Sequence, residues 1–238
     1  MNSPAEIHIP LTNIQRLISE RMLRSKRSKP CFYIELKADV TEMMGLRHNL
    51  TKALRTKITS NAFFVRALAL AVRQYPMMVA RVIEENQIGG RRIAYIRIAE
   101  AINVGFAVNA PQGLVVPVIK NADNKTLAQI ASEEKLLTEK ARSKKLRLED
   151  IEGQTIALSN LGAYGIDSFI GIVPPPTSTI LDVGNVLQAV VAKDGQIKAR
   201  KMVNLSLAVD RTVICEYYAA RFLQSIKGLI EKPERLID

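Results

Sequence analysis

The residues best placed for chemistry lie in two short segments, one around Ser159 and one from Asp210 to Glu216. A serine hydroxyl can donate a hydrogen bond to a developing oxyanion. Arg211 carries a guanidinium, which stays protonated and offers only donors, so it cannot act as a general base. Cys215 could become a thiolate nucleophile beside this cation, but no histidine stands near it to move a proton. We therefore favour a buried or inert thiol at Cys215.

The remaining histidines and cysteines do not add a site. The chain has two of each, His8, His48, Cys31 and Cys215, without any C-x-x-C spacing. This excludes a recognisable zinc site and makes a disulfide framework improbable, so we expect no metal. His8 precedes the first expected helix and His48 lies within a helical stretch, where we expect surface or structural roles.

The charge of the chain raises the question of nucleic acid. The formal net charge is +11, with basic clusters at residues 24–29, 142–147 and 198–201. No aromatic-rich RNA-binding signature or recognition helix accompanies these clusters, so we favour solvated faces or docking of acidic protein or coenzyme phosphates. No stretch approaches the length of a membrane span, and no export signal precedes the first helix, so we expect a cytoplasmic protein without membrane contact.

The apolar spacing predicts the elements that must position these residues. Helices are expected over residues 10–28, 41–54, 62–74, 126–143 and 216–230, and strands over 31–40, 101–108, 114–119, 155–159, 178–183, 186–191 and 198–208. Pro117 predicts an edge strand or a bulge in its run, because proline cannot donate to a ladder. Mixed strands and helices without a repeat or linker indicate one α/β domain.

The expected helix over residues 126–143 has two kinds of face. Leu127, Ile130, Leu136 and Leu137 are assigned to its apolar side. Glu133, Glu134, Lys135, Glu139 and Lys140 are assigned to the opposite side, where Glu-to-Lys neighbours indicate solvent.

Six collinear pieces carry a family resemblance that runs from about Ile9 to Leu236. They lie at residues 9–12, 25–33, 113–119, 159–169, 174–184 and 219–223. In this order they resemble the catalytic core of the dihydrolipoamide acyltransferases of 2-oxoacid dehydrogenase complexes. The resemblance implies a chloramphenicol-acetyltransferase-like fold, a two-layer sandwich with a mixed β-sheet and flanking helices. We expect residues 1–9 to form an N-terminal arm and residues 10–238 the core domain, without a lipoyl or peripheral-subunit-binding domain.

The resemblance also implies an activity and an assembly. The family moves an acyl group between a lipoyl thiol and coenzyme A in a channel between subunits of a trimer, which often builds a cubic or dodecahedral shell. A histidine deprotonates the thiol, and a serine or threonine from across the interface stabilises the oxyanion. We expect no covalently bound cofactor and no lipoyl attachment site, and coenzyme A is the candidate ligand.

The catalytic motif departs from the family pattern. The hallmark Asp-His-Arg-x-x-Asp-Gly is represented by Asp210, then Arg211 at the general-base position and Thr212 for arginine. Cys215 takes the place of the second aspartate, and Glu216 that of glycine. The oxyanion donor is retained as Ser159. Cys31 stands where many relatives have histidine, and a salt bridge from Glu216 to Arg211 or Arg21 is conceivable.

Three hypotheses follow from these departures. The preferred one is a catalytically inactive core protein that trimerises, with a larger shell, an active acyltransferase paralogue or other complex subunits as candidate partners. The second is a residual or altered acyltransferase that uses Ser159 with coenzyme A. The third is a basic binding module that keeps the coenzyme pocket as a ligand or sensor site.

Overall fold

The computed structural model describes residues 8–53, 56–86, 92–193 and 195–238. Most of the expected arm therefore lies outside the described residues, as does position 54 at the end of the second expected helix. The α-helices are α1 (Asn13–Ser28), α2 (Thr41–Ala53), α3 (Ser60–Gln74), α4 (Leu127–Arg142), α5 (Leu148–Ile151) and α6 (Glu216–Glu231). Short 3-10 turns are η1 (Pro76–Val79), η2 (Ala122–Asn124), η3 (Gly162–Tyr164) and η4 (Pro233–Leu236).

The strands form one large mixed sheet and two hairpins. They are β1 (Cys31–Asp39), β2 (Ala80–Asn86), β3 (Arg92–Ile98), β4 (Val104–Phe106), β5 (Val108–Ala110), β6 (Gly113–Val115), β7 (Val118–Ile119), β8 (Ile156–Asn160), β9 (Thr179–Val183), β10 (Leu187–Lys193) and β11 (Gln196–Asp210). The large sheet runs β1-β11-β9-β8-β4-β7, and β10 pairs with β11. The pairs β4–β8 and β8–β9 are parallel. The expected α/β class with a mixed sheet and flanking helices is confirmed.

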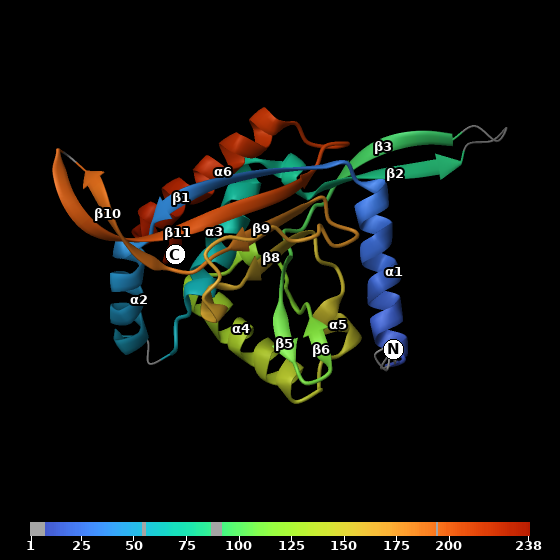
Figure 1. Ribbon diagram of the computed structural model, residues 1–238, viewed down its shortest axis with the longest axis horizontal. Helices are drawn as coiled ribbons and strands as arrows, with labels where there is room; N and C mark the ends of the chain where they lie inside the picture. Colours follow the sequence, from blue (N-terminus) through green and yellow to red (C-terminus); the bar gives the residue numbers. More distant parts are fainter. Residues whose placement is uncertain (1–7, 54–55, 87–91, 194) are drawn as a thin grey trace, which may run out of the picture.

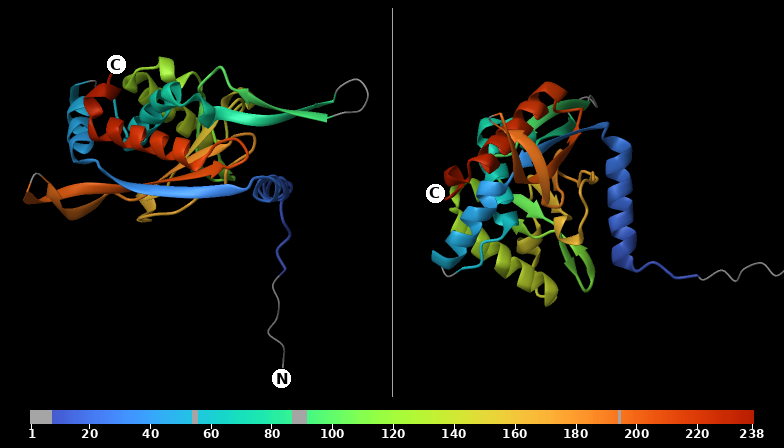
Figure 2. Two further views of the ribbon diagram at one scale, coloured as in Figure 1. Left: turned by 90° about the horizontal axis from the view of Figure 1, so that it is seen from above. Right: turned by 60° about the vertical axis from the view of Figure 1, so that its left-hand side comes forward.

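Helices cover one face of this sheet. Figure 2 shows α3, α4 and α6 together on one side, while α1 stands at the end of β1, away from them. The central helix α3 is buried along most of its length because its sequence is almost continuously apolar. Its first turn is capped by Thr59, whose hydroxyl accepts a hydrogen bond from Ala62 N at 3.0 Å.

Local signals placed several boundaries correctly. Thr12 caps α1 and forms a reciprocal capping box with Gln15. Pro117 separates β6 from β7, and β7 is an edge strand, as the proline predicted. The two runs around Pro111, expected as strands over residues 101–108 and 114–119, form a hairpin that is split into the β5–β6 pair and the β4–β7 pair.

The assignment of faces on α4 is wrong at two residues. Leu136 is 52% exposed, whereas Glu134 is only 8% exposed. Glu134 continues the buried stripe of Leu127, Ile130 and Leu137 at helical spacing. The side chain is charged, but its position on the helix places it toward α3, where it finds hydrogen-bond partners.

Several projecting elements leave apolar side chains in solvent. Figure 1 shows the β2–β3 and β10–β11 hairpins extending from opposite ends of the body. Large apolar side chains are exposed on α1, just before it and on these hairpins: Leu11, Leu17, Ile18, Leu23, Val82, Ile96, Ile98, Leu187, Val190 and Ile197. Within the described ranges, no helix is long and apolar enough to cross a membrane.

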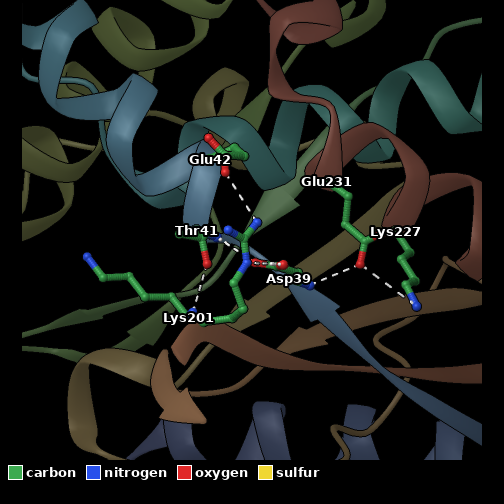
Figure 3. Close-up of polar contacts among 7 residues, drawn as sticks. Asp39, Thr41, Glu42, Lys201, Lys227 and Glu231 are labelled. Atoms are coloured by element: carbon green, nitrogen blue, oxygen red, sulfur yellow. Dashed lines mark hydrogen bonds and ion pairs between the residues drawn. The ribbon is translucent and has the colours of Figure 1, made fainter. Parts of the chain in front are cut away.

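A charged corner ties the base of the β10–β11 hairpin to β1, α2 and α6 (Figure 3). Arg200 Nε donates to Asp39 Oδ2 at 2.6 Å, and its NH2 group reaches Glu42 Oε1 at 3.2 Å. Asp39 N donates to Glu231 Oε1 at 3.0 Å. Burial alone would raise the pKa of Asp39, but hydrogen bonds from Thr41 and Arg200 outweigh it and lower the pKa to about 2.

This corner gives a testable pH dependence of stability. A carboxyl whose pKa is depressed on folding stabilises the protein above its unfolded pKa, and the contribution disappears as pH falls toward 2. Asp39→Asn should lower the free energy of unfolding by about 2 kcal/mol at pH 7 and by much less near pH 2.5. Urea denaturation at both pH values measures this. Glu42→Gln is the matched control, because its carboxylate is 67% exposed and should contribute under about 1 kcal/mol. Equal losses in the two variants would contradict the assignment.

Candidate active-site region

The turn after β11 holds the residues that the family resemblance compares with the catalytic motif. Asp210 ends the strand and is 6% exposed, and its Oδ1 accepts a hydrogen bond from Thr212 N at 3.0 Å. Its carbonyl oxygen accepts from Val213 N and Ile214 N at 3.2 and 3.1 Å. These bonds close a tight turn that leads into α6. The buried aspartate thus shapes the backbone on which Arg211 and Cys215 are presented.

Arg211 lies on the surface and is paired within the chain. Its backbone N donates to the carbonyl oxygen of Pro30 at 3.0 Å, and its Nε donates to Glu216 Oε1 at 2.8 Å. The two side chains are 51% and 57% exposed. This ion pair is one of the two that the sequence made conceivable. Arg21 instead donates to the carbonyl oxygen of Pro175.

The two cysteines differ in their surroundings. Cys215 is exposed at the N-cap of α6, where its side chain caps no backbone amide. Cys31 begins β1 opposite Asp210 and is half-buried. Burial, together with the Asp210 carboxylate, raises the pKa of the Cys31 thiol, which makes it less reactive. The exposure of Cys215 differs from the buried thiol that the sequence also allowed.

Ser159 is the half-buried penultimate residue of β8. In the parallel ladder it lies beside Asp182 of β9, and Asp182 lies opposite Ser206 of β11. Ser206 in turn lies opposite Glu35 of β1. Side chains in register share a face, so these four residues form a polar row across the sheet. No local pattern in the sequence indicates this row, because it depends on which strands become neighbours.

One chain does not bring Ser159 and Arg211 together. Ser159 lies two strands away from β11, at the level of Ser206, and Arg211 stands at the far end of that strand. At about 3.3 Å per residue and 4.8 Å per strand, the two positions are on the order of 20 Å apart. A site that uses both residues therefore requires more than one copy of the chain.

A pocket of about 430 Å³ lies on the helix side of the sheet, between α3, α4 and the end of β8. Its wall contains Asn160, which follows Ser159, together with Phe106, Glu134 and Arg142. Its volume is in the range of small-ligand pockets, and it combines apolar and polar walls. Arg142 offers a cation to an anionic ligand.

Glu134 is the polar feature of this pocket that sequence reasoning missed. Its carboxylate accepts hydrogen bonds from the Thr59 hydroxyl at 2.5 Å and from Asn61 Nδ2 at 3.1 Å. Burial raises its pKa, and the two hydrogen bonds oppose that shift. The signal that could have found it was its spacing from Ile130 and Leu137 on the buried side of the helix.

The two histidines lie on the surface, outside the elements that carry the row and the turn. His48 is exposed on α2, which lies on the opposite side of the body from α1 in Figure 1. His8 is exposed and precedes α1.

Two glycines hold the end of β8 against the end of β9. A Cβ on Gly162 would lie 2.5 Å from the carbonyl oxygen of Gly184. A Cβ on Gly184 would collide with the carbonyl oxygen of Asp167. Backbones this close leave no space for a side chain, so both positions require glycine.

The fold class follows from comparison with known structures. A chloramphenicol acetyltransferase aligns over 89% of this chain and 94% of its own with a TM-score of 0.50 and 12% identity. That level of likeness establishes the fold, a mixed sheet flanked by helices, as expected from the sequence.

Closer relatives establish the family. The 2-oxoacid dehydrogenases acyltransferase (catalytic domain) profile matches residues 3–237, and the chain belongs to this family. It is 32% identical over 240 residues to the dihydrolipoyllysine-residue acetyltransferase component of the pyruvate dehydrogenase complex of Rickettsia bellii. The match covers 99% of this chain and 55% of that protein, so the chain spans about half the length of this relative.

Two solved structures align equally well. One is the cubic core of a pyruvate dehydrogenase multienzyme complex. The other comes from work on a serine, a histidine and an asparagine in the catalytic mechanism of the Azotobacter vinelandii dihydrolipoamide acetyltransferase. Each has a TM-score of 0.88 and 30% identity, covering 98% of this chain and 95% of the other.

The close backbone contacts at Gly162 and Gly184 can be tested by substitution. Gly184→Ala should lower the free energy of unfolding by about 1–3 kcal/mol, because the added methyl group meets backbone that cannot rotate away. Gly45→Ala in α2 is the control, since no atom lies within 4 Å of its Cβ position and alanine favours a helix by about 0.8–1.0 kcal/mol. Denaturant titrations compare the two. Similar stabilities for both variants would show that the backbone around Gly184 can shift to accept a methyl group.

Proposed function

We propose that this chain is a catalytically inactive core subunit of the dihydrolipoamide acyltransferase type, which assembles in the cytoplasm as a trimeric or higher-order scaffold. The observation that carries the proposal is the state of Arg211. It stands where the family resemblance has the general base, and it pairs with Glu216 on the surface. A guanidinium cannot accept a proton from a thiol, so the step that begins acyl transfer lacks its base.

The surface of the chain supports assembly. Apolar side chains gather on α1 and on the two projecting hairpins, and two of them, Val190 and Ile197, are 75% and 83% exposed. Apolar surface concentrated on projecting elements marks interaction sites. A relative with a TM-score of 0.88 forms a cubic core, which supports a second copy of the chain as the occupant. An active acyltransferase paralogue or other complex subunits would extend such a shell.

A second candidate function is residual acyl transfer to or from coenzyme A. Ser159 is half-buried at the end of β8 and remains available as an oxyanion donor once another copy approaches. The pocket with Arg142 offers a place for a coenzyme phosphate or its pantetheine arm. Substrate binding and an oxyanion donor can sustain weak catalysis without a base.

The scaffold proposal predicts a mass of at least three chains in solution. Light scattering on the purified full chain measures it. Val190→Asp together with Ile197→Asp should shift the population toward smaller species, because charge on these exposed positions opposes contact. Val82→Asp tests the other hairpin, and Leu136→Asp on the exposed side of α4 is the control that should leave the mass unchanged. A wild-type monomer would end the proposal.

The inactivity proposal predicts background turnover from the wild-type chain in a dihydrolipoamide and acetyl coenzyme A assay. Arg211→His with Cys215→Asp should raise the rate by about 10²-fold or more, since a general base contributes about 10² to 10⁴. Adding Ser159→Ala to that variant should lower its rate by about 10²- to 10³-fold. Wild-type turnover that disappears with Ser159→Ala alone would favour the second candidate.

Binding of coenzyme A is a separate question from turnover. Calorimetric titration with coenzyme A at two salt concentrations distinguishes the pocket from general phosphate attraction, which weakens steeply with salt. Arg142→Ala should weaken pocket binding, whereas Arg147→Ala, at an exposed site outside the pocket lining, should leave it unchanged. Equal binding by both variants would remove the pocket from consideration.

A further inference from the structure

Residues 166–177 form an extended strap across the face of the sheet that the large helices do not cover. On β9, Leu181 and Val183 pack in the main core with the helices. Ile180 points to the other face, where it packs with Val173 of the strap, Ala157 and Ala208 in a second small core. The strap is therefore the cover of this second face in one chain.

The strap is bonded to α1 along its second half. The buried Ser25 hydroxyl donates to the carbonyl oxygen of Val173 at 2.5 Å. Arg21 donates to the carbonyl oxygen of Pro175, and Lys29 donates to that of Thr177. These contacts attach α1, with its exposed apolar side chains, to the body through the strap.

The strap is bonded to the sheet along its first half. Ser168 Oγ donates to Glu35 Oε2 at 3.0 Å, and Asn204 Nδ2 donates to the carbonyl oxygen of Asp167 at 2.9 Å. Gly171 N donates to Asp182 Oδ2 at 2.8 Å. A Cβ on Gly171 would lie 2.9 Å from Asp182 Oδ1, so the strap backbone rests directly on this carboxyl group.

Asp182 is poorly suited to carry a charge in this position. It is 1% exposed, and its Oδ1 has no hydrogen-bond partner in the part of the chain that the structure describes. Its neighbours in register are the uncharged Ser159 and Ser206. Glu35 lies one strand beyond Ser206, and Asp167 lies on the strap. The nearby cations are Lys37, two residues after Glu35 on β1, and Arg21 and Lys29 of α1, which donate to strap carbonyl groups. Burial raises the pKa of Asp182 to about 7, against the single hydrogen bond from Gly171.

We propose that protonation of Asp182 controls whether the strap and α1 stay packed against the sheet. While Asp182 keeps its proton, both stay packed, and loss of that proton loosens both. This regulation rests on the proposed assembly function. The exposed Ile166, Ile170 and Ile172 of the strap and the apolar side chains of α1 then move together. An ionised Asp182 regains water only when the strap lifts, because Gly171 covers it.

The direction of the pH response follows from linkage. The closed strap holds the Asp182 proton more tightly than an open, hydrated carboxyl does, so raising the pH favours opening. With a closed-state pKa of about 7 and an ordinary value of 3.8 in the open state, the opening equilibrium increases about tenfold between pH 6 and pH 8. Well above pH 7 the response levels off, because both states are ionised.

Hydrogen exchange measured by mass spectrometry on the full chain tests whether Asp182 controls opening of the strap. Peptides covering residues 166–177 are compared at pH 6 and pH 8, each divided by the exchange rate of the unfolded chain at the same pH. The wild type should show about tenfold more opening at pH 8. Asp182→Asn mimics the protonated acid and should change less than twofold. Asp182→Ala, which removes the carboxyl, should behave like Asp182→Asn.

Two controls separate this proposal from folding and from assembly. Glu35→Gln removes the other ionisable group of the row, while its amide oxygen can still accept from Ser168, so it should keep the tenfold response. Peptides from α4 should exchange equally in all variants, which shows that the fold is retained. Light scattering at both pH values reports assembly independently. A monomer would overturn the proposed function, and hydrogen exchange of the strap peptides would still test the role of Asp182. If both Asp182 variants keep the wild-type pH response, the proposed role of Asp182 is wrong.

Discussion

The pairing of β11 with its three neighbours is the constraint on which the rest of the structure depends. This strand lies between β1 and β9 over its second half and pairs with β10 over its first. Its register places Arg200 at the charged corner, Ser206 in the polar row and Arg211 just beyond the last pair. A slip of one residue would turn Ser206 toward the helices and bring apolar side chains to the other face.

The two faces of the sheet are buried in different ways. The helix side buries a continuous apolar core, and the buried carboxylate of Glu134 on that side accepts hydrogen bonds from Thr59 and Asn61. The strap side has only a small apolar cluster, and beside it a carboxyl group, Asp182, that has one donor for two oxygens. Burial without full hydrogen bonding favours the neutral acid. Stability is therefore concentrated on the helix side, while sensitivity to protons is concentrated under the strap.

The turn after β11 depends on a buried carboxylate more than on the charged side chains at its surface. Asp210 remains buried and accepts the hydrogen bond that closes the turn. Arg211 and Glu216, which follow on the surface, form an ion pair with each other. An exposed pair of this kind contributes little to stability. The turn therefore depends on Asp210 and on the start of α6 more than on this ion pair.

The sequence by itself determined most of the elements and the α/β class, because helical and strand spacing, capping residues and prolines act over a few positions. The resemblance of six collinear motifs indicated the family. It also determined that Arg211 cannot serve as a base, which is a property of the side chain alone. Only the tertiary structure decided that Glu134 is buried, that Ser159 stands beside Asp182, and that one chain keeps Ser159 far from Arg211. These outcomes depend on which strands pair and in what register, and long-range pairing is set by packing of the whole domain rather than by any local pattern.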